Sequence, residues 1–162
     1  MTPDEKIDLL DRTLNRILGA IGSADAKVAQ LFAISTGMLG FEATIVAKIK
    51  PFTWYDCVLI AISVLPLLFC IFSLFMVLYP RLSGPSTSVL YFNKIASADG
   101  DCYKNRVDGL KDADLFDDYA RQCHRNAEIA RDKFNWLRKA NLALFIAIVP
   151  WLTIVLVGYS GL

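Results

Sequence analysis

The stretch from Cys57 to Pro80 limits what this chain can fold into more than any other part of the sequence. It reads CVLIAISVLPLLFCIFSLFMVLYP and contains no charged residue. A helix needs roughly 20 mostly apolar residues to cross the hydrocarbon core of a bilayer. A chain of 162 residues is too short to cover so apolar a helix on every side with a core of its own. We therefore predict a transmembrane helix over residues 57–79, in which Pro66 requires neighbouring helices to bond the carbonyl that it frees.

Two further apolar stretches predict two more spans. Residues 28–47, VAQLFAISTGMLGFEATIVA, are more polar than the first stretch but long enough to cross a bilayer. Only a short loop separates them from the next span, so residues 28–80 are expected to form an antiparallel hairpin. Residues 140–162 predict a third transmembrane helix, with an apolar part that ends near Val157 and a possible kink at Pro150. The fold class expected is an all-α membrane protein.

Apolar residues spaced alternately by three and four form a heptad pattern on each of two predicted helices. The N-terminal heptad face consists of Ile7, Leu10, Leu14, Ile17, Ile21, Ala24, Val28 and Leu31. The C-terminal heptad face consists of Phe116, Ala120, Cys123, Ala127, Ala130, Phe134 and Leu137. Each face continues without a break into an apolar span, so we predict two long helices that pack together as a coiled-coil-like bundle outside the membrane. The alternative is that each face packs against other subunits of an oligomer.

Two polar regions flank the predicted spans. Residues 1–27 predict an amphipathic helix, and because no short apolar segment precedes a cleavage site there, we do not expect a signal peptide. In the second region, residues 81–139, the segment 87–96 predicts either a short helix or an extended strand. Residues 97–112 are rich in Asp, Gly and Asn and predict a loop, after which a helix resumes at Ala113.

The distribution of Lys and Arg predicts the orientation in the membrane. Only Lys48 and Lys50 lie on the side of the predicted hairpin loop, and all other basic residues lie in 1–27 or 79–139. The positive-inside rule therefore places the N-terminus and residues 81–139 in the cytosol and the C-terminus outside. A net charge of +1 gives no reason to expect a nucleic-acid partner.

Motifs for metal binding and catalysis are missing from the sequence. The four cysteines form no CxxC pair, and His124 is the single histidine, so neither a zinc site nor a disulfide framework is expected. Asp99-Gly100-Asp101 resembles the start of a calcium loop, but Lys104 takes the position of the required glycine and Leu110 that of the bidentate glutamate. Phosphate-binding loops and nucleophile motifs are absent as well, so we expect neither an enzyme nor a cofactor.

Ionisable residues near the spans are candidates for signal coupling. Glu42 lies inside the first predicted span, where it either serves a polar pore or intersubunit contact or reaches the headgroups or Lys48. Asp25 and Lys27 precede the first span, and Lys133 precedes the third. In the heptad frame Asp25 and Lys133 take e and g positions, which predicts an ion pair between parallel helices.

A set of short motifs, in this order along the chain, resembles a known family. They are Gly22-Ser23-Ala24-Asp25-Ala26-Lys27, Tyr79-Pro80-Arg81, Tyr91-Phe92 with Ile95-Ala96, and Gln122 followed by Ile129, Lys133-Phe134 and Ala140. Together they resemble the transmembrane effectors of Pycsar, bacterial antiphage proteins found beside a pyrimidine nucleotide cyclase. The resemblance implies a cytosolic sensor for cyclic CMP or cyclic UMP and helices that impair the inner membrane, so that infection is aborted.

The polar regions contain side chains that suit such a ligand. A cyclic nucleotide offers a phosphate for Arg or Lys, a flat base for Tyr or Phe, and polar edges for Asn or Gln. The candidates for ligand binding are Tyr91, Phe92, Asn93, Lys94, Arg121, Gln122 and Arg125. A homo-oligomer in contact with membrane lipid is expected. The alternative functions are a small oligomeric channel or a scaffold subunit without a nucleotide ligand.

Overall fold

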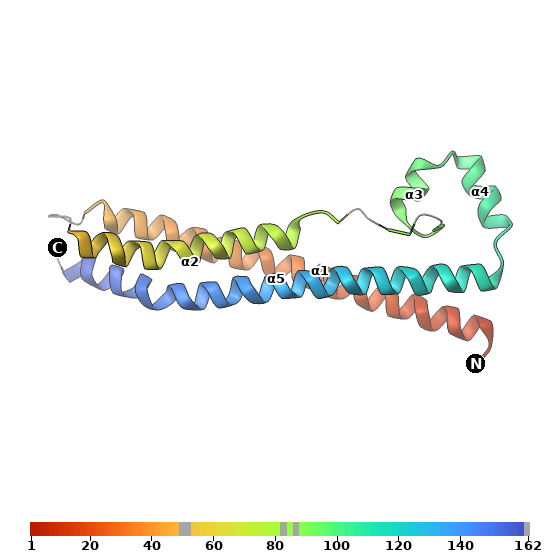
Figure 1. Ribbon diagram of the computed structural model, residues 1–162, viewed down its shortest axis with the longest axis horizontal. Helices are drawn as coiled ribbons and strands as arrows, with labels where there is room; N and C mark the ends of the chain where they lie inside the picture. Colours follow the sequence, from red (N-terminus) through yellow and green to blue (C-terminus); the bar gives the residue numbers. More distant parts are fainter. Residues whose placement is uncertain (49–52, 82–83, 86–87, 161–162) are drawn as a thin grey trace. The chain divides into compact units, whose positions relative to one another are not determined.

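The computed structural model describes residues 1–48, 53–81, 84–85 and 88–160. Within these residues every regular element is a helix: α1 (Pro3–Val46), α2 (Trp54–Leu78), α3 (Phe92–Ser97), α4 (Gly100–Asp108) and α5 (Asp112–Ser160) (Figure 1). Three of them, α1, α2 and α5, are long and apolar enough to cross a membrane. The prediction of an all-α membrane protein is thereby confirmed. The helix continues through Pro66 in α2 and through Pro150 in α5.

The chain divides into two compact units, which we describe separately. The polar unit contains Met1–Ser23 and Pro80–Asp132, and the membrane unit contains Ala24–Tyr79 and Lys133–Leu162. Both α1 and α5 contribute one part to each unit. Helices α1 and α5 therefore extend beyond the apolar stretches, because each contains a polar and an apolar segment.

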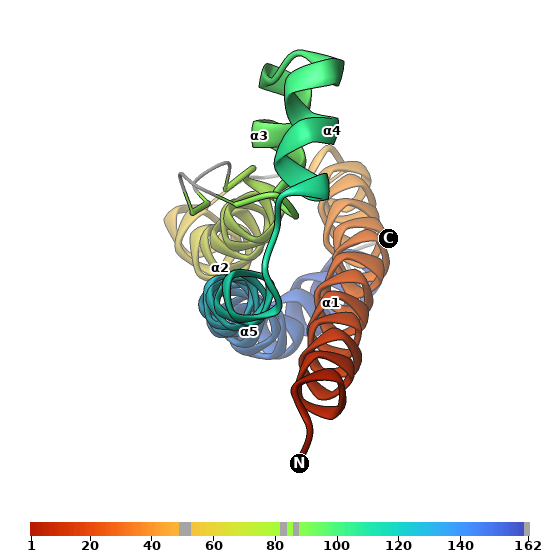
Figure 2. The same ribbon diagram turned by 90° about the vertical axis from the view of Figure 1, so that its right-hand side faces the viewer.

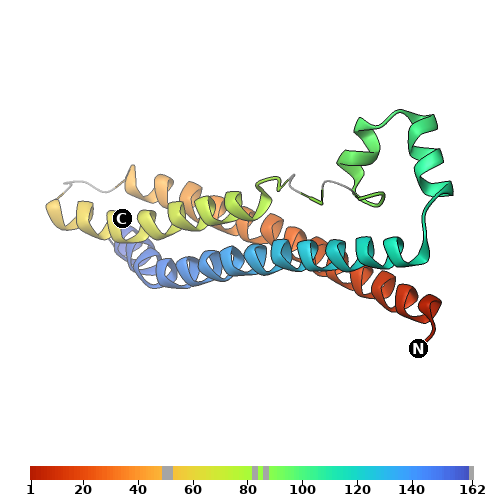
Figure 3. The same cartoon turned by 45° about the vertical axis from the view of Figure 1, so that its right-hand side comes forward.

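The membrane unit is built from α1, α2 and α5, which lie side by side (Figures 1 and 3). Ser35 contacts Cys70 and Glu42 contacts Ser63, so residue numbers rise along α1 as they fall along α2. This order confirms the predicted antiparallel hairpin. The carboxylate of Asp56 accepts a hydrogen bond from the backbone N–H of Thr53 at 2.8 Å, which fixes the start of α2. The buried core consists of Ala24, Val28, Leu67, Cys70, Leu74, Val77, Leu137, Ala140, Ala143, Leu144 and Ala147.

Helices α1 and α5 are parallel in the membrane unit. The indole N–H of Trp151 donates to the carbonyl of Met38 at 3.0 Å, and further along both helices Gly158 packs against Ile45. A Cβ atom added to Gly158 would lie 2.2 Å from Ile45 Cγ2, so only glycine permits this approach of the two helices. Alanines on the inner face of α5 serve the same close packing elsewhere.

In the polar unit, α3 and α4 lie next to each other, and the chain passes from α4 directly into the first turn of α5 (Figure 2). The prediction of a loop over residues 97–112 is wrong, because α4 occupies Gly100–Asp108. Asp99 caps this helix by accepting hydrogen bonds from the backbone N–H groups of Asp101 and Cys102. The acidic segment that resembles a calcium loop is therefore a helix start. The predicted segment 87–96 is described from Ser88 onward, and among these described residues the helix begins at Phe92.

The residues of the two predicted heptad faces differ in how deeply they are buried. Each residue of the N-terminal face is buried or half-buried. On the C-terminal face Cys123 and Leu137 are buried, whereas Phe116, Ala127 and Phe134 are exposed in the single chain. In the polar unit a different face of α5 packs against the turn around Ser88, which buries Asp118 and Gln122. The faces still meet, since the thiol of Cys123 donates to the carbonyl of Leu10 at 3.3 Å.

Candidate ligand-binding site

A hydrogen-bonded centre attaches the turn before α3 to the side of α5. The carboxylate atom Asp118 Oδ2 accepts bonds from the Ser88 hydroxyl at 3.0 Å and from the backbone N–H of Val89 at 2.8 Å. Ser88 Oγ in turn accepts from the Gln122 amide at 2.8 Å and from the backbone N–H of Tyr91 at 3.0 Å. Ser88, Asp118 and Gln122 are all buried. This network fixes the backbone at Tyr91 relative to α5.

Beside this network the polar unit contains a cavity of about 270 Å³, which we call the cationic cavity. Its lining comes from α1, the segment before α3, and α5. The lining residues are Leu14, Leu18, Arg81, Gly84, Leu90, Tyr91, Phe92, Gln122, Arg125, Asn126 and Ile129. They include two guanidinium groups and no carboxylate, which favours an anionic ligand. The volume is near the lower end of small-molecule pockets, at roughly 300 Å³.

The aromatic side of the cavity is formed by Tyr91 and Phe92. Their rings meet edge to face, with centroids 5.1 Å apart. Gly84 packs on the ring of Tyr91, and a Cβ at this position would lie 2.7 Å from the ring atom Cε1. Gly84 therefore allows the chain to cover one side of the Tyr91 ring. Phe92 is 63% exposed and forms the rim.

The two cations of the cavity are held in different ways. Arg81 donates to the carbonyl of Ile129 at 3.2 Å, so one end of its guanidinium group is anchored to α5. Arg125 pairs with Glu128 at 2.9 Å, and this hydrogen bond lowers the pKa of the Glu128 carboxyl below its ordinary value. The side chains of Arg125 and Glu128 are both about one-third exposed, and solvent-exposed ion pairs are weak. A phosphate can therefore compete with Glu128 for Arg125.

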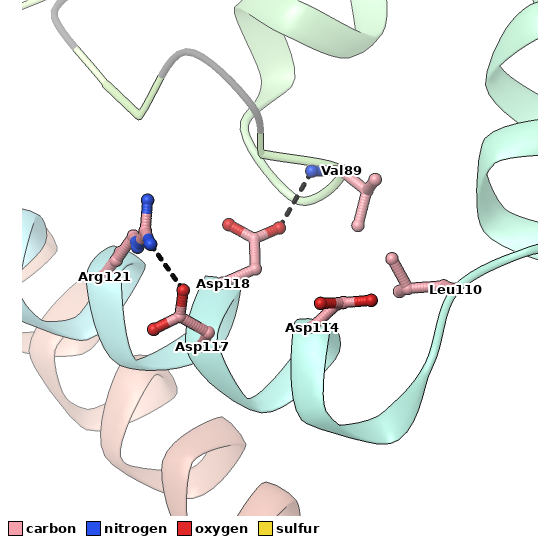
Figure 4. A pocket seen from close by; sticks show the side chains of 6 residues that line it. All are labelled: Val89, Leu110, Asp114, Asp117, Asp118 and Arg121. Atoms are coloured by element: carbon pink, nitrogen blue, oxygen red, sulfur yellow. Dashed lines mark hydrogen bonds and ion pairs between the residues drawn. The ribbon is translucent and has the colours of Figure 1, made fainter.

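A second cavity of about 330 Å³, which we call the acidic cavity, includes Val89 and Asp118, which are joined by a hydrogen bond (Figure 4). It is lined by Val89, Leu110, Asp114, Asp117, Asp118 and Arg121. Arg121 pairs with Asp117 at 2.5 Å, which leaves the carboxylates in excess (Figure 4). Such a lining disfavours an anionic ligand.

The structure separates the seven predicted ligand-binding residues. Four of them line the cationic cavity together: Tyr91, Phe92, Gln122 and Arg125. Arg121 belongs to the acidic cavity instead, because it lies one turn away on α5. Asn93 and Lys94 are exposed on α3 and do not contribute to either lining.

Sequence reasoning missed several residues of the site. Arg81 lies in the motif Tyr79-Pro80-Arg81, so a signal for it was present. Ser88 and Asp118 gave no signal, because their roles depend on a contact between segments 30 residues apart. Asn126 donates to the backbone carbonyl of Gln122 at 2.9 Å and so orients the polar part of the lining.

In the membrane unit the predicted ion pair is present. Lys133 Nζ donates to Asp25 Oδ1 at 2.5 Å, and the side chain of Lys133 is only 11% exposed. Lys27 has its ammonium group 6.0 Å from the ring centroid of Phe134. Glu42 is 2% exposed, and its carboxylate accepts from the Ser63 hydroxyl at 2.8 Å. It therefore lies between α1 and α2 and does not reach Lys48.

The model of one known protein family matches nearly the whole chain. Residues 9–160 match the family model described as the Pycsar effector protein domain. No curated protein and no solved structure matches the chain. The matched range contains the cationic cavity, the acidic cavity and the apolar parts of the three candidate spans.

Proposed function

Because the chain belongs to the Pycsar effector family of antiphage proteins, we propose that it senses cyclic CMP or cyclic UMP and then impairs the bacterial inner membrane. The observation that carries the sensing step is the cationic cavity. It combines two arginines, a covered tyrosine ring and two side-chain amides in one lining. The acidic cavity offers no comparable set.

Each part of the ligand has a partner in the cationic cavity. The cyclic phosphate binds Arg81 and Arg125, since guanidinium groups form strong charge-assisted bonds with phosphate oxygens. The pyrimidine stacks on the aromatic pair Tyr91 and Phe92. The side-chain amide of Asn126 and the side-chain carbonyl oxygen of Gln122 form hydrogen bonds with the polar edges of the base or the ribose.

The signal passes through α1 and α5, because each of these helices is covalently continuous between the two units. A ligand shifts a two-state protein only by its different affinity for the two states. Leu14 and Leu18 of α1 and Arg125 of α5 line the same cavity, so a bound nucleotide contacts both helices. Any change in their packing there is transmitted along the helices to Asp25 and Lys133.

The membrane step depends on Glu42. In the structure its carboxylate is enclosed and bonded to Ser63, with Oε1 lacking a partner among the described residues. An ionisable group in a span is costly unless it serves a function. We infer that ligand binding changes the packing of α1 against α2, so that Glu42 meets neighbouring subunits of a homo-oligomer. In this proposal the N-terminus and residues 81–139 are cytosolic, and the protein is an effector without enzymatic activity or cofactor.

The sensing step is tested by calorimetry of the purified full-length protein with cyclic CMP, cyclic UMP and cyclic dinucleotides. Arg125→Ala should weaken binding by about tenfold to a hundredfold, the value of a charge-assisted hydrogen bond. Arg121→Ala is the matched control, because it removes the same side chain one turn away, outside the cationic cavity. Equal losses from both variants, or no binding to any cyclic pyrimidine nucleotide, would reject this site and favour the scaffold or channel alternatives.

The aromatic contact is tested with Tyr91. Tyr91→Ala should lose roughly 1–3 kcal/mol of stacking, whereas Tyr91→Phe keeps the ring and should bind nearly as well as the wild type. Gly84→Ala should also weaken binding, because its methyl group would displace the ring. Unchanged affinity in Tyr91→Ala would place the base elsewhere.

The membrane step is tested separately by dye leakage from liposomes, with and without the nucleotide. Glu42→Leu should bind the nucleotide normally but fail to release the dye, since its site is far from the cavity residues in the sequence and lies in the membrane unit. Glu42→Gln keeps a partner for Ser63 and separates the effect of charge from that of shape. If Glu42→Leu releases dye as well as the wild type, helix packing alone carries the membrane step.

A further inference from the structure

A groove in the membrane unit lies between α2 and α5. Leu65, Pro66 and Phe69 line it from α2, and Leu142, Ala143 and Ile146 line it from α5. Its volume is about 310 Å³. The one charged residue in the lining is Lys139. Apart from that ammonium group, the groove offers only apolar surface.

Lys139 of α5 lies next to a part of α2 where a cation is unusual. Phe72 of α2 and Trp136 of α5 meet edge to face, with ring centroids 6.1 Å apart, so these two residues lie at the same level. From Phe72 the uncharged helix continues to Leu78, a further distance of about 9 Å at 1.5 Å per residue. Lys139 is one turn beyond Trp136 in the opposite direction and lies beside Phe69. Its Cα is therefore next to the apolar middle of α2.

The Lys139 side chain turns back from this level. Its ammonium group lies 3.9 Å from the centroid of the Trp136 ring. Long basic side chains near the ends of spans extend in this way to reach polar headgroups. Trp136 thus holds the ammonium group by a cation–π contact, at the end of the groove where α5 becomes polar.

The cations of this region have no carboxylate partner in the described part of the chain. Arg138 and Lys139 are adjacent and exposed, and neither forms an ion pair with a described carboxylate. The nearest basic neighbour on α5, Lys133, is already paired with Asp25. A groove lined by apolar residues and Lys139, with Arg138 next to Lys139 in the sequence, complements a molecule with an anionic head and a hydrocarbon tail.

We propose that this groove binds an anionic phospholipid of the cytosolic leaflet. One acyl chain lies along Pro66, Phe69 and Ala143, and the phosphate bonds Lys139 and Arg138. Basic pockets between spans on the cytosolic side bind anionic headgroups by the same chemistry. A zwitterionic lipid has the same acyl chains but carries its own cation near the phosphate, so it binds more weakly.

Native mass spectrometry of the detergent-solubilised full-length protein tests the proposal, with phosphatidylglycerol and phosphatidylcholine of identical acyl chains as probes. We expect more bound phosphatidylglycerol than phosphatidylcholine, by fivefold or more. The double variant Arg138→Gln/Lys139→Gln should abolish this preference. The matched control Lys104→Gln/Arg106→Gln changes the same charge on α4 in the polar unit and should keep it.

A second variant tests the groove apart from the charge. Ile146→Trp fills the apolar surface at a side chain that is 55% exposed, so the fold should tolerate it. It should reduce the number of bound lipids of both kinds while Lys139 is intact. Equal binding of the two lipids by the wild type would overturn the proposal. So would a change in oligomer size in the Gln variants with lipid binding unchanged, because the cations would then face a second subunit.

Discussion

The ion pair between Asp25 and Lys133 should respond unequally to the loss of its two partners. Asp25 is 38% exposed, whereas Lys133 is 11% exposed, and their charged atoms are 2.5 Å apart. Asp25→Asn keeps the shape of the side chain but leaves the ammonium group of Lys133 without an opposite charge where water has little access. An amide oxygen at position 25 can still accept from the ammonium group, but the bond is no longer between two opposite charges, and we expect a cost of about 1.5–3 kcal/mol.

Lys133→Met should cost less. It removes the buried charge and keeps the apolar part of the side chain, and water can still reach the carboxylate of Asp25. We expect a loss of about 0.5–1 kcal/mol, as for an exposed ion pair. The double variant Asp25→Asn/Lys133→Met should then be more stable than Asp25→Asn alone, because the unpaired ammonium group is gone.

Equilibrium unfolding of the full-length protein in mixed detergent micelles, followed by tryptophan fluorescence, measures these differences. The charge swap Asp25→Lys/Lys133→Asp provides a further check, since it should recover part of the loss of either single reversal. Two results would refute the reasoning. One is an equal cost for Asp25→Asn and Lys133→Met, and the other is strict additivity in the double variant.

Four further predictions follow from packing, chemistry and charge. Ile17→Asp should reduce the yield of folded, detergent-solubilised protein, because it forces a charge onto the half-buried N-terminal heptad face; normal yield and oligomer size would contradict this packing. At pH 8 a maleimide should label exposed Cys102 faster than Cys123, because burial raises the pKa of the Cys123 thiol, and equal rates measured by mass spectrometry would count against the buried position. Gly158→Ala should lower stability in micelles by about 1–3 kcal/mol through crowding against α1, and an unchanged unfolding midpoint would mean that the helices are further apart. A reporter fused after Leu162 should be active only if it functions in the periplasm, and cytosolic activity would invert the predicted topology.

The sequence alone predicts the membrane helices and their order, because these depend on local properties. An uncharged apolar run such as residues 57–79 must leave water whatever the rest of the chain does. The N-terminal heptad face could also be predicted, since α1 buries one continuous side along its length. The pair Asp25–Lys133 followed from the same periodicity, because parallel helices bring fixed heptad positions together.

Helix α4 shows that amino-acid composition alone can predict the wrong local structure. Asp and Gly are common in loops, so the composition of residues 97–112 predicted a loop, whereas Asp99 in fact caps the start of α4. The exposed position of Phe116 on the C-terminal heptad face has a different reason. Periodicity on α5 identifies its apolar face, but it does not show that the turn at Ser88 buries Asp118 and Gln122 on another face.

The candidate site depends most on tertiary structure. Arg121 and Arg125 are the same residue type one turn apart on α5, and sequence gives no reason to separate them. The folded chain separates them, because Arg121 lines the acidic cavity and Arg125 lines the cationic cavity. Arg81 reaches the cationic cavity through its bond to the carbonyl of Ile129, across 48 positions of the chain. Contacts over such separations leave no periodic pattern, so only the folded chain decides which charges share a cavity.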